Sequence, residues 1–246
     1  MKLTLAEPKL FKEPIMVISE LVNEVVFKID REKLELIAMD PANVAMVVYK
    51  LLGNVFVEYD MDKEVEIAVN LDNLKQVLRR AKPSDTLTME LLESKLKITL
   101  KSSSTRIFTL SLINLQEERQ KVPDLDFKCK IEIPSILFDE AIEDMDVVSD
   151  SAAFEVNDNN FNIQAAGNIS TAKVSFAHGD MIKINSKENN IRARYSIEYL
   201  KKIIKGSKLS DNMTLLMSND YPLKVEYKII DKLSLATILA PRVSND

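Results

Sequence analysis

The sequence has few of the residues that build reactive or metal-binding sites. Its 246 residues include one cysteine, one histidine, four glycines and no tryptophan. Because Cys129 and His178 are the single members of their kinds, neither a disulfide framework nor a zinc site is expected. His178 lies in the segment AHGD, which is typical of a turn, and Cys129 lies in the alternating segment FKCKIEI, which is typical of a strand.

Motifs of catalytic and nucleotide-binding sites are also missing. The four glycines form no GxxxxGK(S/T) phosphate-binding loop. Five acidic residues crowd the range 139–146, but helical spacing would spread them over one face, so we interpret them as solvated surface. We therefore predict that the protein is not an enzyme and that it uses no cofactor and no metal.

The composition also bears on whether the protein is a membrane, secreted or nucleic-acid-binding protein. No apolar run approaches the roughly 20 residues of a membrane helix, and the N-terminal MKLTLAEPKLF lacks the pattern of a signal peptide. With a single cysteine, this favours a cytoplasmic location. The net charge is −5 and aromatic residues make up 6%, which disfavours overall attraction to DNA and base-stacking platforms. A nucleic-acid role would need a local basic surface.

Part of the sequence occurs twice. Residues 69–89 read VNLDNLKQVLRRAKPSDTLTM, and residues 195–215 read YSIEYLKKIIKGSKLSDNMTL, at a constant offset of 126. An offset of about half the chain indicates two copies of one domain.

Each half of the sequence predicts a similar series of elements. Residues 8–22 and 134–148 are helix-like, and Pro14 should bend or delay the first helix. Apolar residues that alternate with polar ones, such as Leu34, Leu36 and Ala38, indicate half-buried strands. Four segments after the repeated helices predict two hairpins: 86–92 with 95–100, and 213–217 with 223–229.

A charged segment, LQEERQKVPDLDF at 115–127, separates the halves and indicates an exposed linker. We predict an α+β protein with an N-terminal domain at 1–114, a connector at 115–127 and a C-terminal domain at 128–246. Each domain should pack two helices on antiparallel β-sheets.

The repeated helix carries the same positive charges in both copies. On a helix over 71–82, Leu71, Leu74, Val77, Leu78 and Ala81 form an apolar stripe. The cationic positions lie on another side, at Lys75, Arg79 and Lys82 in the first copy and at Lys201, Lys205 and Lys208 in the second, with Arg80 and Lys202 beside them. One such helix alone would be read as a solvated face. A triplet of one sign kept in both copies favours contact with phosphates without base readout.

The other two helices carry no such excess. Residues 134–146 have five acidic and no basic residues, whereas 8–22 balance Lys9 and Lys12 against Glu13 and Glu20. If the four helices faced one partner, their charges would sum to about +1, so DNA would be held loosely and could slide.

Several stretches resemble the archaeal sliding clamps of the proliferating cell nuclear antigen type. These are PLKVEYKIIDKLSLATILAPRVSND at the C-terminus, AMDPANVAMV at 38–47, VNLDNLKQVLRRA at 69–81, and the Val122-Pro123 and Phe127 positions of the connector. The resemblance runs nearly end to end. It implies a trimeric, pseudo-sixfold ring that encircles duplex DNA, with no catalytic activity. It also implies a clamp loader (replication factor C) and tethered DNA polymerase, flap endonuclease and DNA ligase as partners.

The resemblance assigns roles to particular residues. The DNA-facing set would be Lys12, Lys75, Arg79, Arg80, Lys82, Lys201, Lys202, Lys205 and Lys208. A groove for partner peptides would comprise Met39, Val44, Met46, Val122, Pro123, Phe127, Tyr221, Pro222, Leu239, Ala240 and Pro241. The family often has an aliphatic residue where this chain has Gln120, so one wall of this groove is expected to differ.

In the family, subunit contacts join a strand before the connector to a strand of the second domain. The resemblance thus implies that residues 105–113 contact residues 170–177 of a neighbour, and both segments have the character of edge strands. The contact set would be Arg106, Ile107, Phe108, Leu110, Leu112, Lys173, Val174, Ser175 and Phe176.

Two questions stay open at this level. The helix at 134–146 is normally basic in the family and is acidic here, at Glu140 and Glu143 for example. A ring of non-identical subunits and a homotrimer that binds DNA weakly would both account for this. The alternative to a DNA clamp is a clamp-fold scaffold that recruits partners without contacting DNA strongly. For a clamp on DNA, we expect association with the nucleoid.

Overall fold

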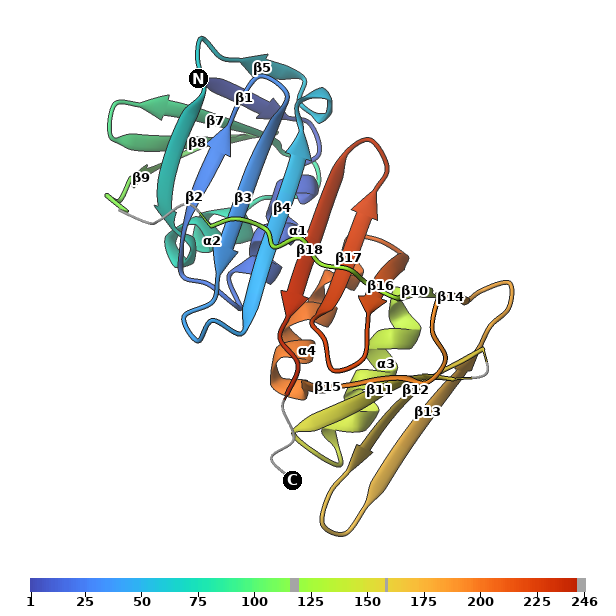
Figure 1. Cartoon of the computed structure of the whole chain (residues 1–246). Helices are drawn as coiled ribbons and strands as arrows, with labels where there is room; N and C mark the ends of the chain where they lie inside the picture. The colour runs from blue at the N-terminus through green and yellow to red at the C-terminus, as the bar shows by residue number, and fades with distance from the viewer. Residues whose placement is uncertain (116–119, 158, 243–246) are drawn as a thin grey trace. The chain divides into compact units, whose positions relative to one another are not determined.

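The computed structural model describes residues 1–115, 120–157 and 159–242. The chain divides into two compact units (Figure 1). The first unit comprises 1–41, 47–122 and 229–235, and the second comprises 42–46, 123–228 and 236–246. Residues 42–46, from the first half of the sequence, thus belong to the second unit, and residues 229–235, from the second half, belong to the first unit.

The first half of the chain forms nine strands, two α-helices and a 3-10 turn. Its elements are β1 (Lys2–Leu5), α1 (Lys9–Ile18), β2 (Glu24–Ile29), β3 (Lys33–Met39), β4 (Ala45–Leu52), η1 (Gly53–Val55), β5 (Glu58–Asp60), β6 (Val65–Asn70), α2 (Leu71–Arg79), β7 (Thr86–Leu92), β8 (Lys95–Lys101) and β9 (Thr105–Ser111). The strand orders are β5-β1-β7-β8-β9 and β4-β3-β2-β6.

The second half repeats this plan. Its elements are β10 (Cys129–Pro134), α3 (Ser135–Asp146), β11 (Ser151–Asn157), β12 (Asn160–Ala166), β13 (Thr171–Ala177), β14 (Lys183–Ser186), β15 (Ile191–Ser196), α4 (Ile197–Ile203), η2 (Ile204–Lys208), β16 (Asn212–Met217), β17 (Leu223–Ile229) and β18 (Leu233–Leu239). The strand orders are β14-β10-β16-β17-β18 and β13-β12-β11-β15.

The duplication extends over whole domains. The first residues of α3, β13, β15 and α4 each follow those of α1, β4, β6 and α2 by 126 positions: Ser135 and Lys9, Thr171 and Ala45, Ile191 and Val65, Ile197 and Leu71. The sequence predicts this offset over 21 residues, and the structure extends it from the first helix to the last. The fold is α+β with two repeated domains, as predicted.

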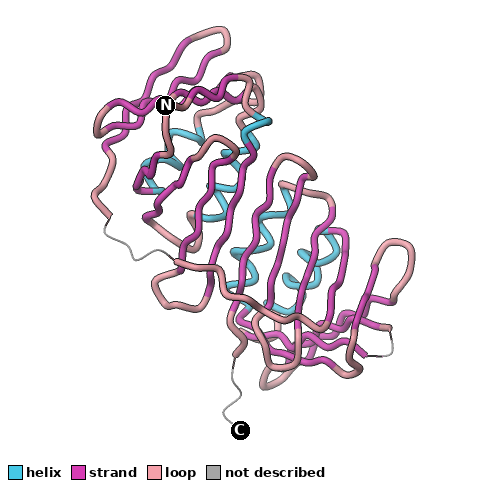
Figure 2. The backbone as a smooth tube through the Cα atoms, turned by 45° about the horizontal axis from the view of Figure 1, so that its top comes forward, coloured by secondary structure: helices cyan, strands magenta, loops and turns pink. Residues whose placement is uncertain are grey.

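In each unit the helices lie against one face of the strands (Figure 2), and apolar side chains fill the space between them. In the first unit, Phe11 of α1 packs on Phe27 of β2 with ring centroids 5.8 Å apart. In the second, Phe138 of α3 packs edge-on against Phe154 of β11, at 5.9 Å. Such rings bury 150–250 Å² each, so they anchor α1 and α3 on the strands.

Several details differ from the sequence predictions. Strand β1 precedes the helix that was expected to open the first half, and the short strands β5 and β14 were not foreseen. Strand β10 falls on the alternating segment FKCKIEI, where a strand was expected. Pro14 lies inside α1, which begins at Lys9 and ends at Ile18, four residues before the predicted end. Both predicted hairpins are present, as β7 with β8 and β16 with β17.

Candidate nucleic-acid interface

The basic helix of the first copy is built as the sequence indicates, except at its end. The Asn70 side chain accepts a hydrogen bond from Asn73 N–H and so caps α2. The apolar stripe is buried, and Arg79 and Arg80 are exposed. The helix ends at Arg79, not at Lys82 as predicted. Pro83 explains this, because a proline disfavours α-helical geometry at the residue before it.

In the second copy the same positions continue on a different kind of helix. After α4 ends at Ile203, the chain tightens into η2, which carries Lys205 and Lys208. Gly206 lies between them against the ring of Tyr227, where a Cβ atom would collide with the ring. The cationic triplet is therefore kept in sequence, while its local geometry differs between copies.

One ion pair occurs twice at the repeat offset. Lys75 Nζ of α2 lies 3.1 Å from Glu20 Oε1, just beyond α1. Lys201 Nζ of α4 lies 2.5 Å from Asp146 Oδ2, at the end of α3. Because 75 and 201 differ by 126, as do 20 and 146, each copy joins its second helix to the end of its first by an equivalent pair.

The remaining members of the predicted DNA-facing set are two lysines with contacts inside the chain, described next, and a group of exposed residues. Lys12 Nζ donates to Ala81 C=O at 3.0 Å, at the C-terminal end of α2. Lys202 pairs with Glu198 one helical turn earlier and lies over the Tyr199 ring. The exposed group comprises Arg79, Arg80, Lys82, Lys205 and Lys208.

A buried carboxylate organises the turn after α2. Asp85 Oδ2 accepts from Lys82 N–H at 2.6 Å and from Arg106 NH2 at 2.5 Å, and the Asp85 side chain is 0% exposed. Arg106 also donates to Arg80 C=O at 2.8 Å. The Lys82 amide, then Ser102 and Arg106, lower the Asp85 pKa to about 2. Strand β9 is thereby tied to the segment that carries Arg80 and Lys82.

The two strands predicted for subunit contact are both at sheet edges, β9 in one sheet and β13 in another. Their outward residues are exposed, and Ile107 is 59% exposed. By contrast, the edge strand β15 receives backbone hydrogen bonds from Asp220 N–H and Arg242 N–H.

Besides Arg106, which pairs with Asp85, two residues of the predicted contact set have roles within the chain. Phe176 is buried and stacks on Phe161 at 5.9 Å, so its side chain belongs to the core of the second unit. Leu112 follows β9, and its N–H donates to Ser94 C=O at 2.9 Å.

The predicted peptide groove is partly core. Met46 is 5% exposed and Leu239 is 0% exposed, so these two side chains offer little surface to a peptide. In the second unit, the ring of Phe127 meets that of Tyr221 edge-on at 5.9 Å, and Ala240 N–H donates to Val44 C=O at 2.9 Å. Val44, Pro222, Ala240 and Pro241 are half-buried and Pro123 is exposed. In the first unit, Met39 is half-buried and Val122 is exposed.

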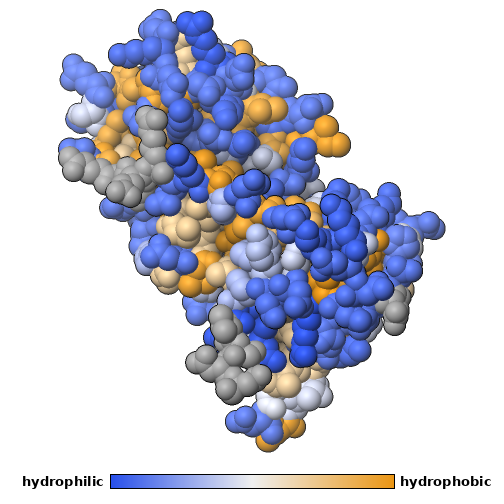
Figure 3. All heavy atoms as spheres, in the orientation of Figure 1, coloured by the Kyte–Doolittle hydropathy of each residue, from blue (hydrophilic) through white to orange (hydrophobic). Residues whose placement is uncertain are grey.

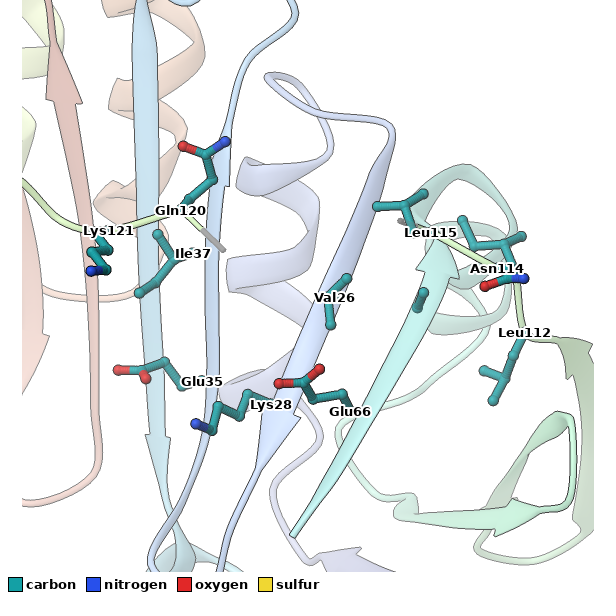
Figure 4. A pocket seen from close by; sticks show the side chains of 12 residues that line it. Val26, Lys28, Glu35, Ile37, Glu66, Leu112, Asn114, Leu115, Gln120 and Lys121 are labelled. Carbon is teal, nitrogen blue, oxygen red and sulfur yellow. The ribbon is translucent and has the colours of Figure 1, made fainter. Parts of the chain in front are cut away.

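The first unit has a hollow that the sequence reading did not single out (Figure 4). Its volume is about 490 Å³. Its floor combines a charged row, in which Lys28 lies between Glu35 and Glu66, with an apolar row that includes Val26 beside Ala68. Leu112–Leu115, Gln120 and Lys121 complete the lining. Period-two alternation on β2, β3 and β6 was the sequence signal that these residues share one face of the sheet.

The face of the molecule seen in Figure 3 carries mainly polar side chains.

Other candidate residues have structural surroundings. His178 Nδ1 accepts from Ile184 N–H at 3.0 Å, which confirms a satisfied loop histidine. Cys129 is a buried residue of β10, and burial raises the pKa of its thiol. On α3, Glu140, Glu143, Asp144 and Asp146 are exposed as expected, whereas Asp139 is half-buried and burial raises its pKa.

Within residues 1–115, 120–157 and 159–242, no group of three or more His, Cys, Asp or Glu side chains could hold a metal ion. No helix in these ranges is long and apolar enough to cross a membrane.

Comparison with known proteins agrees with this architecture. Residues 1–133 match the N-terminal domain, and residues 121–242 the C-terminal domain, of proliferating cell nuclear antigen. The chain is 34% identical to a DNA polymerase sliding clamp of Pyrococcus horikoshii over 96% of this chain and 95% of that protein. It is 32% identical to one of Nanoarchaeum equitans, over 98% and 99%. The crystal structure of proliferating cell nuclear antigen from Thermococcus kodakaraensis superposes with a TM-score of 0.92 at 25% identity, covering 98% of this chain and 99% of that one.

The fold and these matches define a two-domain clamp protein. The chain belongs to the proliferating cell nuclear antigen family, in which the archaeal relatives are DNA polymerase sliding clamps. It is therefore a sliding clamp, a processivity factor rather than an enzyme.

Proposed function

We propose that this chain is one subunit of a trimeric ring that encircles duplex DNA and tethers replication and repair enzymes to it. The observation that carries the proposal is the repetition of cationic positions at an offset of 126 in the two domains. Phosphate contact requires positive charge without sequence readout, and the exposed members Arg79, Arg80, Lys82, Lys205 and Lys208 provide it.

Ring closure would use the edge strands. We propose that β9 of one subunit pairs with β13 of the next, which would satisfy two unpaired edges at once. Support comes from their edge positions and from the exposed Ile107. We propose Arg106, Phe108, Leu110 and Leu112 on one side, and Lys173, Val174, Ser175 and Phe176 on the other, as further contacts. Phe176 would contribute through backbone and ring edge.

Partner enzymes would dock through short peptides. We propose that DNA polymerase, flap endonuclease and DNA ligase insert apolar anchors beside Phe127, Tyr221 and Val44, with replication factor C as the loader. The Phe127–Tyr221 edge contact supports this, because it provides a partly exposed aromatic surface where an anchor can pack. Within the second unit, Pro123, Pro222, Ala240 and Pro241 would complete the groove. A clamp of this kind would act in the cytoplasm, at the nucleoid.

The test is polymerase processivity on primed circular DNA with the loader present. Longer products with this chain, alone or with sister clamp subunits, are the expected result, and the subunit mixture that works decides between a homotrimer and a heterotrimer. If neither the chain alone nor any mixture lengthens the products while partner peptides still bind, the chain is instead a clamp-fold scaffold. The acidic face of α3 is the observation that favours this second candidate.

A further inference from the structure

Two lysines that the proposed function places near DNA already have anionic partners. We propose that Glu20 and Asp146 compete with DNA phosphates for Lys75 and Lys201, and so limit how firmly the clamp holds DNA. This inference rests on the proposed function and extends it, because it assigns acidic residues an opposing role in DNA contact.

The first support is geometric. Lys75 Nζ lies 3.1 Å from its carboxylate and Lys201 Nζ lies 2.5 Å from its own. The Lys75 side chain is 15% exposed and that of Lys201 is 40% exposed. Both ammonium groups are thus held toward a carboxylate on the chain. Neither pair is fully buried, and the Lys201 pair is the more open of the two to solvent and to a competing anion.

The second support is repetition. The two copies have diverged widely, and the acid itself differs, glutamate in one and aspartate in the other. The lysine is kept, and an acid is kept opposite it at the same offset. The pair Lys202–Glu198 offers a contrast, because the first copy has Gln76 and Asp72 at those positions. The repeated pair is thus a property of the domain, whereas the Lys202 pair is particular to one copy.

The third support is energetic. A solvent-exposed ion pair contributes about 0–1 kcal/mol, so at Lys201, where both side chains are more than a third exposed, a phosphate can displace the carboxylate without unfolding either helix. The Lys75 pair is partly exposed and follows the same logic at a higher cost. The displaced carboxylate would then lie close to the phosphate and repel it. A lysine with a resident carboxylate therefore neutralises less phosphate charge than an unpaired one. Since the salt dependence of binding scales with the phosphates neutralised, the pairs should flatten that dependence.

The experiment is duplex DNA binding by the assembled clamp over a series of salt concentrations, comparing wild type with Glu20→Gln/Asp146→Asn. The amides keep a hydrogen-bonding oxygen and remove the charge. We expect roughly two- to ten-fold tighter binding at low salt, and a salt slope steeper by up to about 0.9 per released lysine. A slope equal to that of wild type would overturn the inference, and so would weaker binding by a fully assembled variant.

Two controls separate local from general effects. Glu93→Gln/Asp180→Asn removes the same charge from exposed turns and should leave the slope near that of wild type. In a Lys75→Ala/Lys201→Ala background, Glu20→Gln/Asp146→Asn should have no further effect, and a persisting increase would contradict competition for those lysines. If the double variant does not assemble, Glu20→Gln and Asp146→Asn are measured singly, with half the effect expected from each. If wild type itself shows no salt-dependent DNA binding, the proposed function fails instead.

Discussion

The Arg106 guanidinium lies 2.5 Å from the buried Asp85 carboxylate, so an edge strand and the basic turn after α2 share one ionic contact. In the second copy, the position 126 residues after Asp85 is Asp211, which is exposed. A buried aspartate at this position is thus found in the first copy, whose last strand, β9, lies at the edge of its sheet. The pair therefore fixes strand β9, which belongs to the proposed subunit contact, against the segment that carries Arg80 and Lys82, which belong to the proposed DNA contact.

Replacing Asp85 should destabilise the protein markedly. Asp85→Asn leaves the Arg106 charge half-buried without its counterion, and breaking such a pair costs about 2–4 kcal/mol of unfolding free energy. The matched control is Asp211→Asn, which should stay within about 0.5 kcal/mol of wild type because the side chain is exposed. Urea unfolding monitored by circular dichroism measures both. Equal effects at the two positions would refute this role for Asp85.

The same carboxylate predicts an acid dependence of stability. Its pKa in the folded chain is lowered to about 2, below the value of about 3.9 for an unfolded aspartate. Its contribution is therefore complete above about pH 4 and is lost as the pH falls from about 4 to about 2. The stability difference between wild type and Asp85→Asn should be constant above about pH 5 and should shrink below about pH 4. A difference that grows on acidification would contradict the assignment.

A charge on β9 should weaken assembly without unfolding the chain. Ile107 is 59% exposed, so Ile107→Glu should change the stability of a single chain by less than about 0.5 kcal/mol, yet it would place a carboxylate in the proposed strand pairing. Ile230→Glu is the control, because Ile230 is 77% exposed in the turn before β18. Sedimentation velocity reads out the mass. If both variants sediment like wild type, Ile107 of β9 does not take part in the subunit contact.

The glycine of η2 should tolerate no side chain. In Gly206→Ala the added methyl would meet the buried Tyr227 ring, and overpacking of this kind costs about 1–3 kcal/mol. Gly179→Ala is a fair control, since an added Cβ there meets no atom within 4 Å. Thermal unfolding should show a clear decrease in Tm for the first variant and little change for the second. Similar Tm values would mean that η2 shifts easily, and that the positions of Lys205 and Lys208 are not fixed by this contact.

Much of the fold could be predicted because its signals are local. Period-two alternation at Leu34, Leu36 and Ala38 predicts β3. Four segments predict the hairpins of β7 with β8 and of β16 with β17, and the constant offset predicts two copies of one domain. The shortest strands could not be predicted, because three or four residues such as those of β5 carry too little periodicity to identify. The burial of Met46 and Leu239 in the predicted groove could not be predicted either, since packing from elements distant in the sequence decides which side of a strand is covered.

The residues of the charged surface could be predicted from the sequence, but the ion pairs that they form could not. The sequence places Lys75 and Lys201 on the basic helix faces, but ion pairs across more than 50 positions depend on how two helices meet. A signal was nevertheless present, because Glu20 and Asp146 are both acidic and lie 126 positions apart. It lay outside the 21-residue stretch in which the repeat is obvious.

The most direct measurement is retention of the loaded clamp on covalently closed circular DNA, compared with the same DNA cut once by a restriction enzyme. A closed ring around the duplex cannot leave a circle but slides off a free end. We therefore predict long retention on the circle at moderate salt and rapid loss after linearisation. Equal retention on both forms would show that the protein grips DNA rather than encircles it, and would contradict the account.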